Sequence, residues 1–136
     1  MADKINIDVV TLDSIQCAAC GYMMESIAAL PDDVQDMITY TEWSIKNKDG
    51  IGKFMELKVK VLPTICIERD LVFESIIPQY EELIDEMAKR APTPEMSERI
   101  KSLREVGFQF DKIQENLRKA GAGASTRSDS TVTVTK

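Results

Sequence analysis

The spacing of apolar residues changes repeatedly along the first part of the chain, and this alternation constrains the possible fold more than any other feature. In KINIDVVTL (4–12) apolar side chains recur at every second position, with one extra valine, which predicts a strand. From Cys17 onward apolar residues fall at helical spacing until Pro31, which ends the predicted helix. The further predicted elements are a strand at 37–45, a short helix at 51–59, strands at 62–68 and 71–75, and a helix at 78–90.

The predicted order of elements is therefore β-α-β-α-β-β-α, which is typical of an α/β protein. A right-handed βαβ unit followed by a ββα hairpin unit builds one mixed sheet with helices on both faces. The length of 136 residues suits one compact domain with an appendage. We therefore assign residues 1–91 to this α/β domain.

The segment APTP at 91–94 breaks the chain, and the sequence beyond it has a different character. Residues 92–121 contain two helical patterns separated by Gly107, which predicts a C-terminal helical extension. Residues 122–136 are mostly small and polar, which predicts a disordered tail. We expect residues 1–91 to fold and to keep their chemistry without the extension.

Charge is divided along the same boundary. The whole chain carries a net charge of −6 and no histidine, which argues against nucleic-acid binding because phosphate contacts need a basic face. Residues 1–91 carry 9 Lys and Arg against 17 Asp and Glu, whereas residues 92–136 carry 8 against 6. The extension could therefore lie against the acidic body, meet an acidic partner, or form a solvated helix pair. A homodimer through the extension is a further hypothesis, since Phe108 and Phe110 need an apolar surface.

The chain shows no sign of export or of membrane insertion. Its start lacks the apolar core and cleavage site of a signal peptide, and no run reaches the roughly 18 apolar residues of a spanning helix. Three cysteines, an odd number, do not resemble the disulfide framework of a secreted protein. We therefore expect a cytoplasmic protein without a membrane partner.

Two cysteines lie three positions apart in LDSIQCAACGYMMESIAALP (12–31), where the first strand gives way to a helix. This junction lies at the carboxyl edge of the sheet, where α/β proteins expose their sites. In the first turn of a helix, unpaired N–H groups and the macrodipole favour a thiolate over a thiol. Cys17 is therefore expected to attack a disulfide, and Cys20, nearly one turn further on, to resolve the product.

Other roles for this pair stay open. The two residues could simply be small side chains in the core. Tetrahedral zinc and iron–sulfur clusters both need four ligands, and only Cys66 could add a further sulfur in one chain. Cys66 alternates with Ile65 and Ile67 in an apolar strand, which favours a core thiol. We favour the redox pair and predict neither a metal nor another cofactor.

Three stretches carry a resemblance to a known family. They are Cys17-Ala18-Ala19-Cys20 after the first strand, Leu62-Pro63-Thr64 in VLPTICIE (61–68), and LVFESIIPQYEELIDEM (71–87). Over residues 4–90 the sequence resembles the thioredoxin-like family, in particular its small glutaredoxin-sized members. The resemblance implies a thioredoxin-like fold with an added C-terminal helix pair.

The resemblance also implies a function. In the family the proline is cis and packs beside the disulfide, so Pro63 would take that place and the Leu62 backbone would face the bound partner. The implied activity is that of a thiol–disulfide oxidoreductase or electron carrier, which reduces a protein disulfide and is itself restored by an upstream reductase. The alternative is a non-catalytic binding module of the same fold, which could hold a metal or a cluster at its cysteines.

The sequence departs from the family in several places. The tryptophan-containing active-site phrase is absent, and Thr11 replaces the buried acid expected six residues before Cys17. Ser75 stands where many relatives have glycine, and a Gly-Gly pair typical of glutathione binding is missing. We therefore expect no dependence on glutathione.

Overall fold

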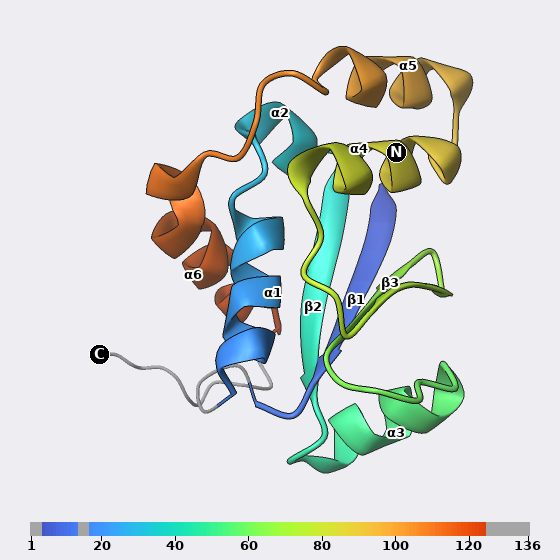
Figure 1. Ribbon diagram of the computed structural model, residues 1–136, viewed down its shortest axis with the longest axis vertical. Helices are drawn as coiled ribbons and strands as arrows, with labels where there is room; N and C mark the ends of the chain where they lie inside the picture. The colour runs from blue at the N-terminus through green and yellow to red at the C-terminus, as the bar shows by residue number, and fades with distance from the viewer. Residues whose placement is uncertain (1–3, 14–16, 125–136) are drawn as a thin grey trace.

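A four-stranded mixed sheet organises the computed structural model, which describes residues 4–13 and 17–124, with side chains up to Arg118 (Figure 1). The sheet has the order β2-β1-β3-β4, in which β1 pairs parallel with β2 and antiparallel with β3, and β3 pairs antiparallel with β4. The chain is therefore an α/β protein with a mixed sheet, as its sequence predicts. The elements are β1 (Ile5–Thr11), α1 (Ala18–Ala28), α2 (Asp32–Gln35), β2 (Ile38–Ser44), α3 (Lys48–Glu56), β3 (Thr64–Ile67), β4 (Asp70–Glu74), α4 (Tyr80–Lys89), α5 (Pro94–Ser102), the 3-10 turn η1 (Phe110–Lys112) and α6 (Ile113–Ala124).

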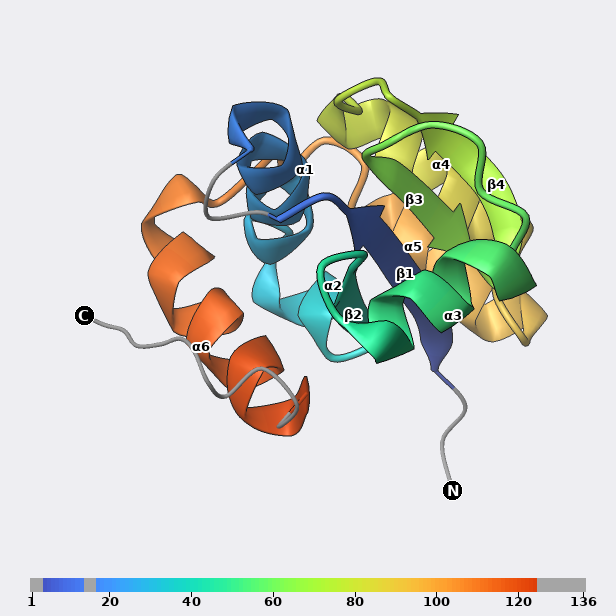
Figure 2. The ribbon, with the colours of Figure 1, turned by 90° about the horizontal axis from the view of Figure 1, so that it is seen from below.

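Helices cover both faces of the sheet, with α1 and α3 on opposite sides (Figure 2). Alternation along β1 sends Ile5, Ile7 and Val9 to one face, here named the α1 face, where they join a core built with α1 and α4. Val10 points to the other face, here named the α3 face, where it packs with Cys66 and the residues around α3. The larger core therefore lies on the α1 face.

The C-terminal extension packs on the body at several points. The helix α5 lies along α4, and its Ile100 is fully buried within the core of the α1 face. The helix α6 lies beside α1 and β2 (Figure 1). The buried Asn116 of α6 donates from Nδ2 to the carbonyl of Ala28 at 2.7 Å, and its own carbonyl accepts the hydroxyl of Tyr40 at 2.9 Å. The extension therefore shares the core of residues 1–91.

Charge complementarity accompanies this packing. Three cations of the extension pair with acids of the body, and the pairs are Arg99–Asp33, Arg104–Asp85 and Lys112–Asp32. Of the two phenylalanines expected to need an apolar surface, Phe108 finds one in its own chain, since its ring meets that of Tyr80 edge to face at 5.3 Å. Phe110 contacts Phe108 but stays 70% exposed. Cations of the extension therefore pair with acids of residues 1–91 within the same chain.

Several element boundaries differ from the predicted ones for local reasons. The helix predicted at 51–59 begins at Lys48, because the side chain of Asn47 caps it by accepting the N–H of Gly50 at 2.8 Å. Pro31, predicted as a helix end, is also the N-cap of the short helix α2, which the sequence did not predict. The helix α6 continues to Ala124, into the segment predicted as a disordered tail, and residues 125–136 of that segment lie outside the described residues. Every helix in the described part of the chain is too short or too polar to cross a lipid bilayer.

Candidate functional site

Cys17 lies at the N-cap of α1, half-buried and in an extended conformation. Its sulfur accepts the backbone N–H of Cys20 at 3.3 Å, in the place where an N-cap oxygen usually accepts. Its own N–H donates to the carbonyl of Asp13 at 2.7 Å, which ties the helix start to the end of β1. The free N–H groups of the first turn and the helix dipole both stabilise negative charge on a sulfur in this position.

Cys20 lies one turn further on, fully buried against the sheet. Burial raises the pKa of the Cys20 thiol, and the hydrogen bond that it shares with Cys17 raises it further. The backbone N–H groups of Leu12 and Asp13 reach the same sulfur and act in the opposite direction. The two thiols are free and differ in their surroundings, because Cys17 is half-buried and accepts the N–H of Cys20, whereas Cys20 is fully buried and its pKa is raised.

The residues expected to bind a partner lie at the same end of the sheet. Thr64 at the start of β3 pairs with Val10 near the end of β1, so Leu62 and Pro63 precede β3 at the edge from which the cysteine segment departs. The Leu62–Pro63 peptide bond is cis, and the carbonyl of Pro63 accepts the N–H of Ser75 at 2.7 Å. Exposed apolar side chains at this end are Leu12, Val61, Ile76 and Ile77.

Cys66 lies apart from the pair. It is fully buried in β3 on the α3 face, opposite Asp8 of β1. Burial first, and the Asp8 carboxylate second, raise the pKa of the Cys66 thiol to about 12. The sequence interpretation of Cys66 as a core thiol agrees with this position, and Cys66 does not join Cys17 and Cys20 in one cluster.

Within the described residues, no group of three or more His, Cys, Asp or Glu side chains is arranged to hold a metal ion. Cys17 and Cys20 are both free thiols, and the Cys17 sulfur accepts the N–H of Cys20. Two neighbouring free thiols can exchange with a disulfide.

Sequence reasoning missed one acidic residue at this end of the sheet. Glu42 lies in β2, half-buried, and its Oε2 accepts the hydroxyl of the fully buried Thr11 at 2.7 Å. Thr11 was noted as a replacement for an acid, but no local pattern connects it with a residue 31 positions later. The parallel register of β1 and β2, which pairs Thr11 with Ser44, brings Glu42 within reach.

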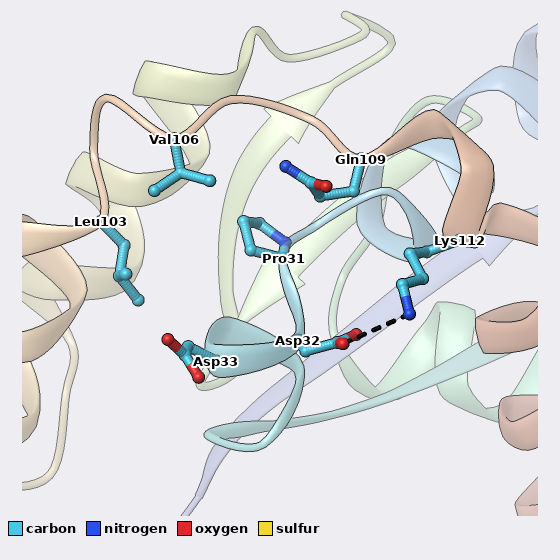
Figure 3. A pocket seen from close by; sticks show the side chains of 7 residues that line it. All are labelled: Pro31, Asp32, Asp33, Leu103, Val106, Gln109 and Lys112. Carbon is cyan, nitrogen blue, oxygen red and sulfur yellow. Dashed lines mark ion pairs between the residues drawn. The ribbon is translucent and has the colours of Figure 1, made fainter.

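A separate hollow lies beyond the C-terminal end of α1, away from the cysteines (Figure 3). It measures about 250 Å³, and its two carboxylates are engaged in ion pairs, Asp32 with Lys112 and Asp33 with Arg99. It is lined by Pro31, Asp32, Asp33, Leu103, Val106, Gln109 and Lys112. The charged side chains of this hollow are held in ion pairs with one another or with Arg99, so we take the cysteine pair as the candidate site.

Comparison of the chain with models of protein families, with curated proteins and with solved structures finds no match.

Proposed function

We propose that the chain is a thiol–disulfide oxidoreductase with a thioredoxin-like fold, which reduces a protein disulfide through Cys17 and Cys20. The element order, the mixed sheet and the position of the cysteine pair at the start of α1 support the proposal. So does the position of the Leu62-Pro63-Thr64 stretch at the same end of the sheet. The dithiol chemistry suits a reducing compartment, and we propose the cytoplasm.

The observation that carries the proposal is that the two cysteine sulfurs differ in exposure and in their surroundings. Cys17 is accessible and accepts a backbone N–H, whereas Cys20 is buried and its pKa is raised by burial and by Cys17. One sulfur is thus accessible at the helix start while the other is buried, and burial raises the pKa of the buried thiol. A pair of packing residues would need no such difference.

The proposed cycle has three steps. The Cys17 thiolate attacks one sulfur of the partner's disulfide, so that a mixed disulfide forms and the partner's other sulfur leaves as a thiolate. Cys20 then loses its proton and attacks the sulfur of Cys17, which releases the second partner sulfur and leaves a Cys17–Cys20 disulfide. A dithiol of an upstream reductase returns two electrons and restores both thiols.

Trapping in cells tests the proposal. Cys20→Ser should accumulate a mixed disulfide between Cys17 and the partner, because the resolving thiol is absent, and a reductant should cleave it. Cys17→Ser is the matched control and should capture nothing. Mass spectrometry of the trapped species would identify the partner.

Two negative results together would overturn the proposal. If neither variant traps a protein, and the wild type reduces no disulfide with a dithiol donor, the oxidoreductase proposal fails. The non-catalytic binding module would then take its place, and metal retained after purification would support it.

A further inference from the structure

Basic residues are concentrated in the segment that contains α3. The net charge of the chain is −6, and residues 1–91 carry 9 Lys and Arg against 17 Asp and Glu. Residues 46–60 alone carry 5 against 2, which leaves 4 against 15 for the rest of residues 1–91. The five cations of this segment are Lys46, Lys48, Lys53, Lys58 and Lys60. The α3 segment is therefore locally basic on an otherwise acidic body.

Three of these lysines have no acidic partner among the described residues. Lys46 and Lys53 form ion pairs with acids of the same chain. Lys48, Lys58 and Lys60 are exposed, and none of them pairs with an acid in the part of the chain that the structure describes. Their charge can therefore act on an anionic group outside the chain.

Exposed apolar side chains lie between these lysines on the outer side of α3. Ile51 is 46% and Met55 69% exposed, and residues four positions apart lie on the same side of a helix. Lys48 and the exposed Gly52 precede Ile51 and Met55 by three positions each, which places them on that side as well. We name this surface the basic patch, and it consists of Lys48, Ile51, Gly52, Met55, Lys58 and Lys60.

Gly52 gives an independent reason to expect another molecule on this side. A glycine within a helix is less favourable than an alanine, so its presence calls for a cause. Gly50 has one inside the chain, because a Cβ there would stand 1.7 Å from the carbonyl oxygen of Ser44. A Cβ on Gly52 would meet no described atom within 4 Å. The bare backbone of Gly52 instead permits a close approach from outside, between Ile51 and Met55.

The basic patch adjoins the proposed site at both ends of α3. Before α3, Lys46 pairs with the Asp13 carboxylate at 3.8 Å, and the Asp13 carbonyl accepts the N–H of Cys17 at 2.7 Å. After α3, the chain leads directly to Leu62 and Pro63. Figure 1 shows α3 and the start of α1 at the same end of the molecule. A protein whose disulfide reaches Cys17 can therefore cover the basic patch at the same time.

We propose that the basic patch is the docking surface for the protein whose disulfide Cys17 attacks, and that this partner presents carboxylates around an apolar side chain. The lysines attract the carboxylates, and Ile51 and Met55 receive the apolar side chain across Gly52. An anionic membrane or a nucleic acid fits less well, because the body around this one helix is acidic. This assignment rests on the proposed function, because it names the class of partner that the cysteine pair serves.

Peptides that carry one cysteine in a disulfide with 5-thio-2-nitrobenzoate test the assignment on the full-length reduced chain. Attack of the Cys17 thiolate on the peptide sulfur forms a mixed disulfide and releases the coloured thiolate, which gives the rate. One peptide contains glutamate and leucine, a second contains lysine and leucine, and a third contains glutamate and serine. At low ionic strength the glutamate–leucine peptide should react about tenfold faster than the lysine–leucine peptide. It should also react about fivefold faster than the glutamate–serine peptide, which lacks the apolar side chains.

Two variants of the basic patch sharpen the test. Lys48→Glu combined with Lys60→Glu should reverse the preference, so that the lysine–leucine peptide reacts faster, a result that damage to the fold would not produce. Gly52→Gln should slow the reaction of the glutamate–leucine peptide about fivefold, because its side chain blocks the close approach. The same variant should unfold at a higher urea concentration than the wild type, because glutamine favours a helix more than glycine does.

The matched control is Lys89→Glu combined with Lys101→Glu. It makes the same change of charge at two exposed lysines on α4 and α5, at the other end of the molecule from α3 (Figure 1). All three peptides should react with it at the wild-type rates. An equal loss of preference in the control would overturn the assignment, since net charge alone would then explain the preference.

Further results would also overturn the assignment. Equal rates for the glutamate–leucine and lysine–leucine peptides would do so, as would a preference that survives Lys48→Glu with Lys60→Glu. Tighter binding to phosphatidylserine vesicles or to an oligonucleotide than to the glutamate–leucine peptide would assign the basic patch to a membrane or to a nucleic acid. A dimer in sedimentation that Lys48→Glu with Lys60→Glu dissociates would assign it to a second copy of the chain.

The proposed function can fail separately from this assignment. A wild type that releases the coloured thiolate but forms no Cys17–Cys20 disulfide would overturn the redox cycle. The fluorescence anisotropy of a labelled glutamate–leucine peptide without cysteine reports docking independently of that chemistry. Docking of this peptide that is lost in Lys48→Glu with Lys60→Glu, and kept in the control, is the result that we expect.

Discussion

Cys20 and Cys66 are both fully buried thiols, and burial is the first cause of the raised pKa of each, yet their surroundings differ. Cys20, at one end of the α1 face, lies against two backbone N–H groups and a second thiol. Cys66, on the α3 face, lies among apolar side chains and opposite the Asp8 carboxylate. Burial alone therefore does not set the reactivity that we expect of a thiol. The neighbouring N–H donors and the presence of a second sulfur also contribute to it.

The two faces also differ in how they are covered. The core of the α1 face is built with α1 and α4 and is completed by Ile100 of the extension. In the part of the chain that the structure describes, α3 is the helix that covers the α3 face, and its Ile51 and Met55 stay exposed. The α1 face therefore supplies most of the buried apolar area, and changes there should have the larger effects on stability.

Truncation after residue 91 should have the largest effect. The truncated chain loses the fully buried Ile100 and the bonds of Asn116 to the body, so the core of the α1 face is uncovered. Because of this packing, we expect residues 1–91 to be less stable without the extension than with it. We expect the free energy of unfolding in urea to fall by at least about 3 kcal/mol.

A point substitution serves as the control for the truncation. Ile100→Ala in the full chain should cost about 2–5 kcal/mol, since it leaves a cavity without removing the helices. Identical urea midpoints for the truncated and full-length chains would show instead that the extension is an appendage.

Substitutions of two glycines in α3 should have the next largest effect on stability. They test how α3 packs on the α3 face of the sheet. A Cβ on Gly50 would stand 1.7 Å from the carbonyl oxygen of Ser44, so Gly50→Ala should displace α3 and cost about 1–3 kcal/mol. Gly52 has open space around it, so Gly52→Ala should stabilise the helix by about 0.5–1 kcal/mol. Thermal or urea unfolding of the two variants measures the difference, and effects of the same sign would mean that α3 does not dock on β2 as described.

The dependence of stability on pH should show the smallest effect. The pKa of the Cys66 thiol rises from its ordinary value of 9.0 to about 12 on folding, so only the unfolded chain loses this proton between those values. The stabilisation is complete below pH 9.0 and is lost as the pH rises toward 12. At pH 10 the wild type should therefore have lost about 1.4 kcal/mol more than Cys66→Ala, relative to pH 7. Parallel curves for the two proteins would show that the thiol is not protected in the fold.

The order of elements could be predicted because each depends on local periodicity. Alternating apolar residues in 4–12 and helical spacing after Cys17 are visible without tertiary structure, and so is the apolar setting of Cys66. The early start of α3 is also local, but its signal is the cap formed by Asn47, which apolar spacing does not reveal.

The other features of the site and of the packing could not be predicted, because they depend on contacts between residues that are distant in the sequence. The pairing of Thr11 with Glu42 follows from the register of β1 against β2, which a sequence without a structure does not specify. Charge asymmetry suggested that the extension could lie on the acidic body, but it could not show that Ile100 enters the core. Side-chain alternation can say which face a residue occupies only after the strands are paired.

The division of the three thiols into one redox pair and one structural thiol is tested most directly by mild oxidation of the full-length reduced chain. Free thiols are counted, the intact mass is measured, and tryptic peptides are mapped after alkylation. We expect two thiols to disappear together, with a loss of two hydrogens confined to the peptide 5–46 that carries Cys17 and Cys20. The peptide that carries Cys66 should remain fully alkylatable once unfolded. A disulfide that includes Cys66, or an oxidised chain in which Cys17 and Cys20 both stay free, would contradict the account.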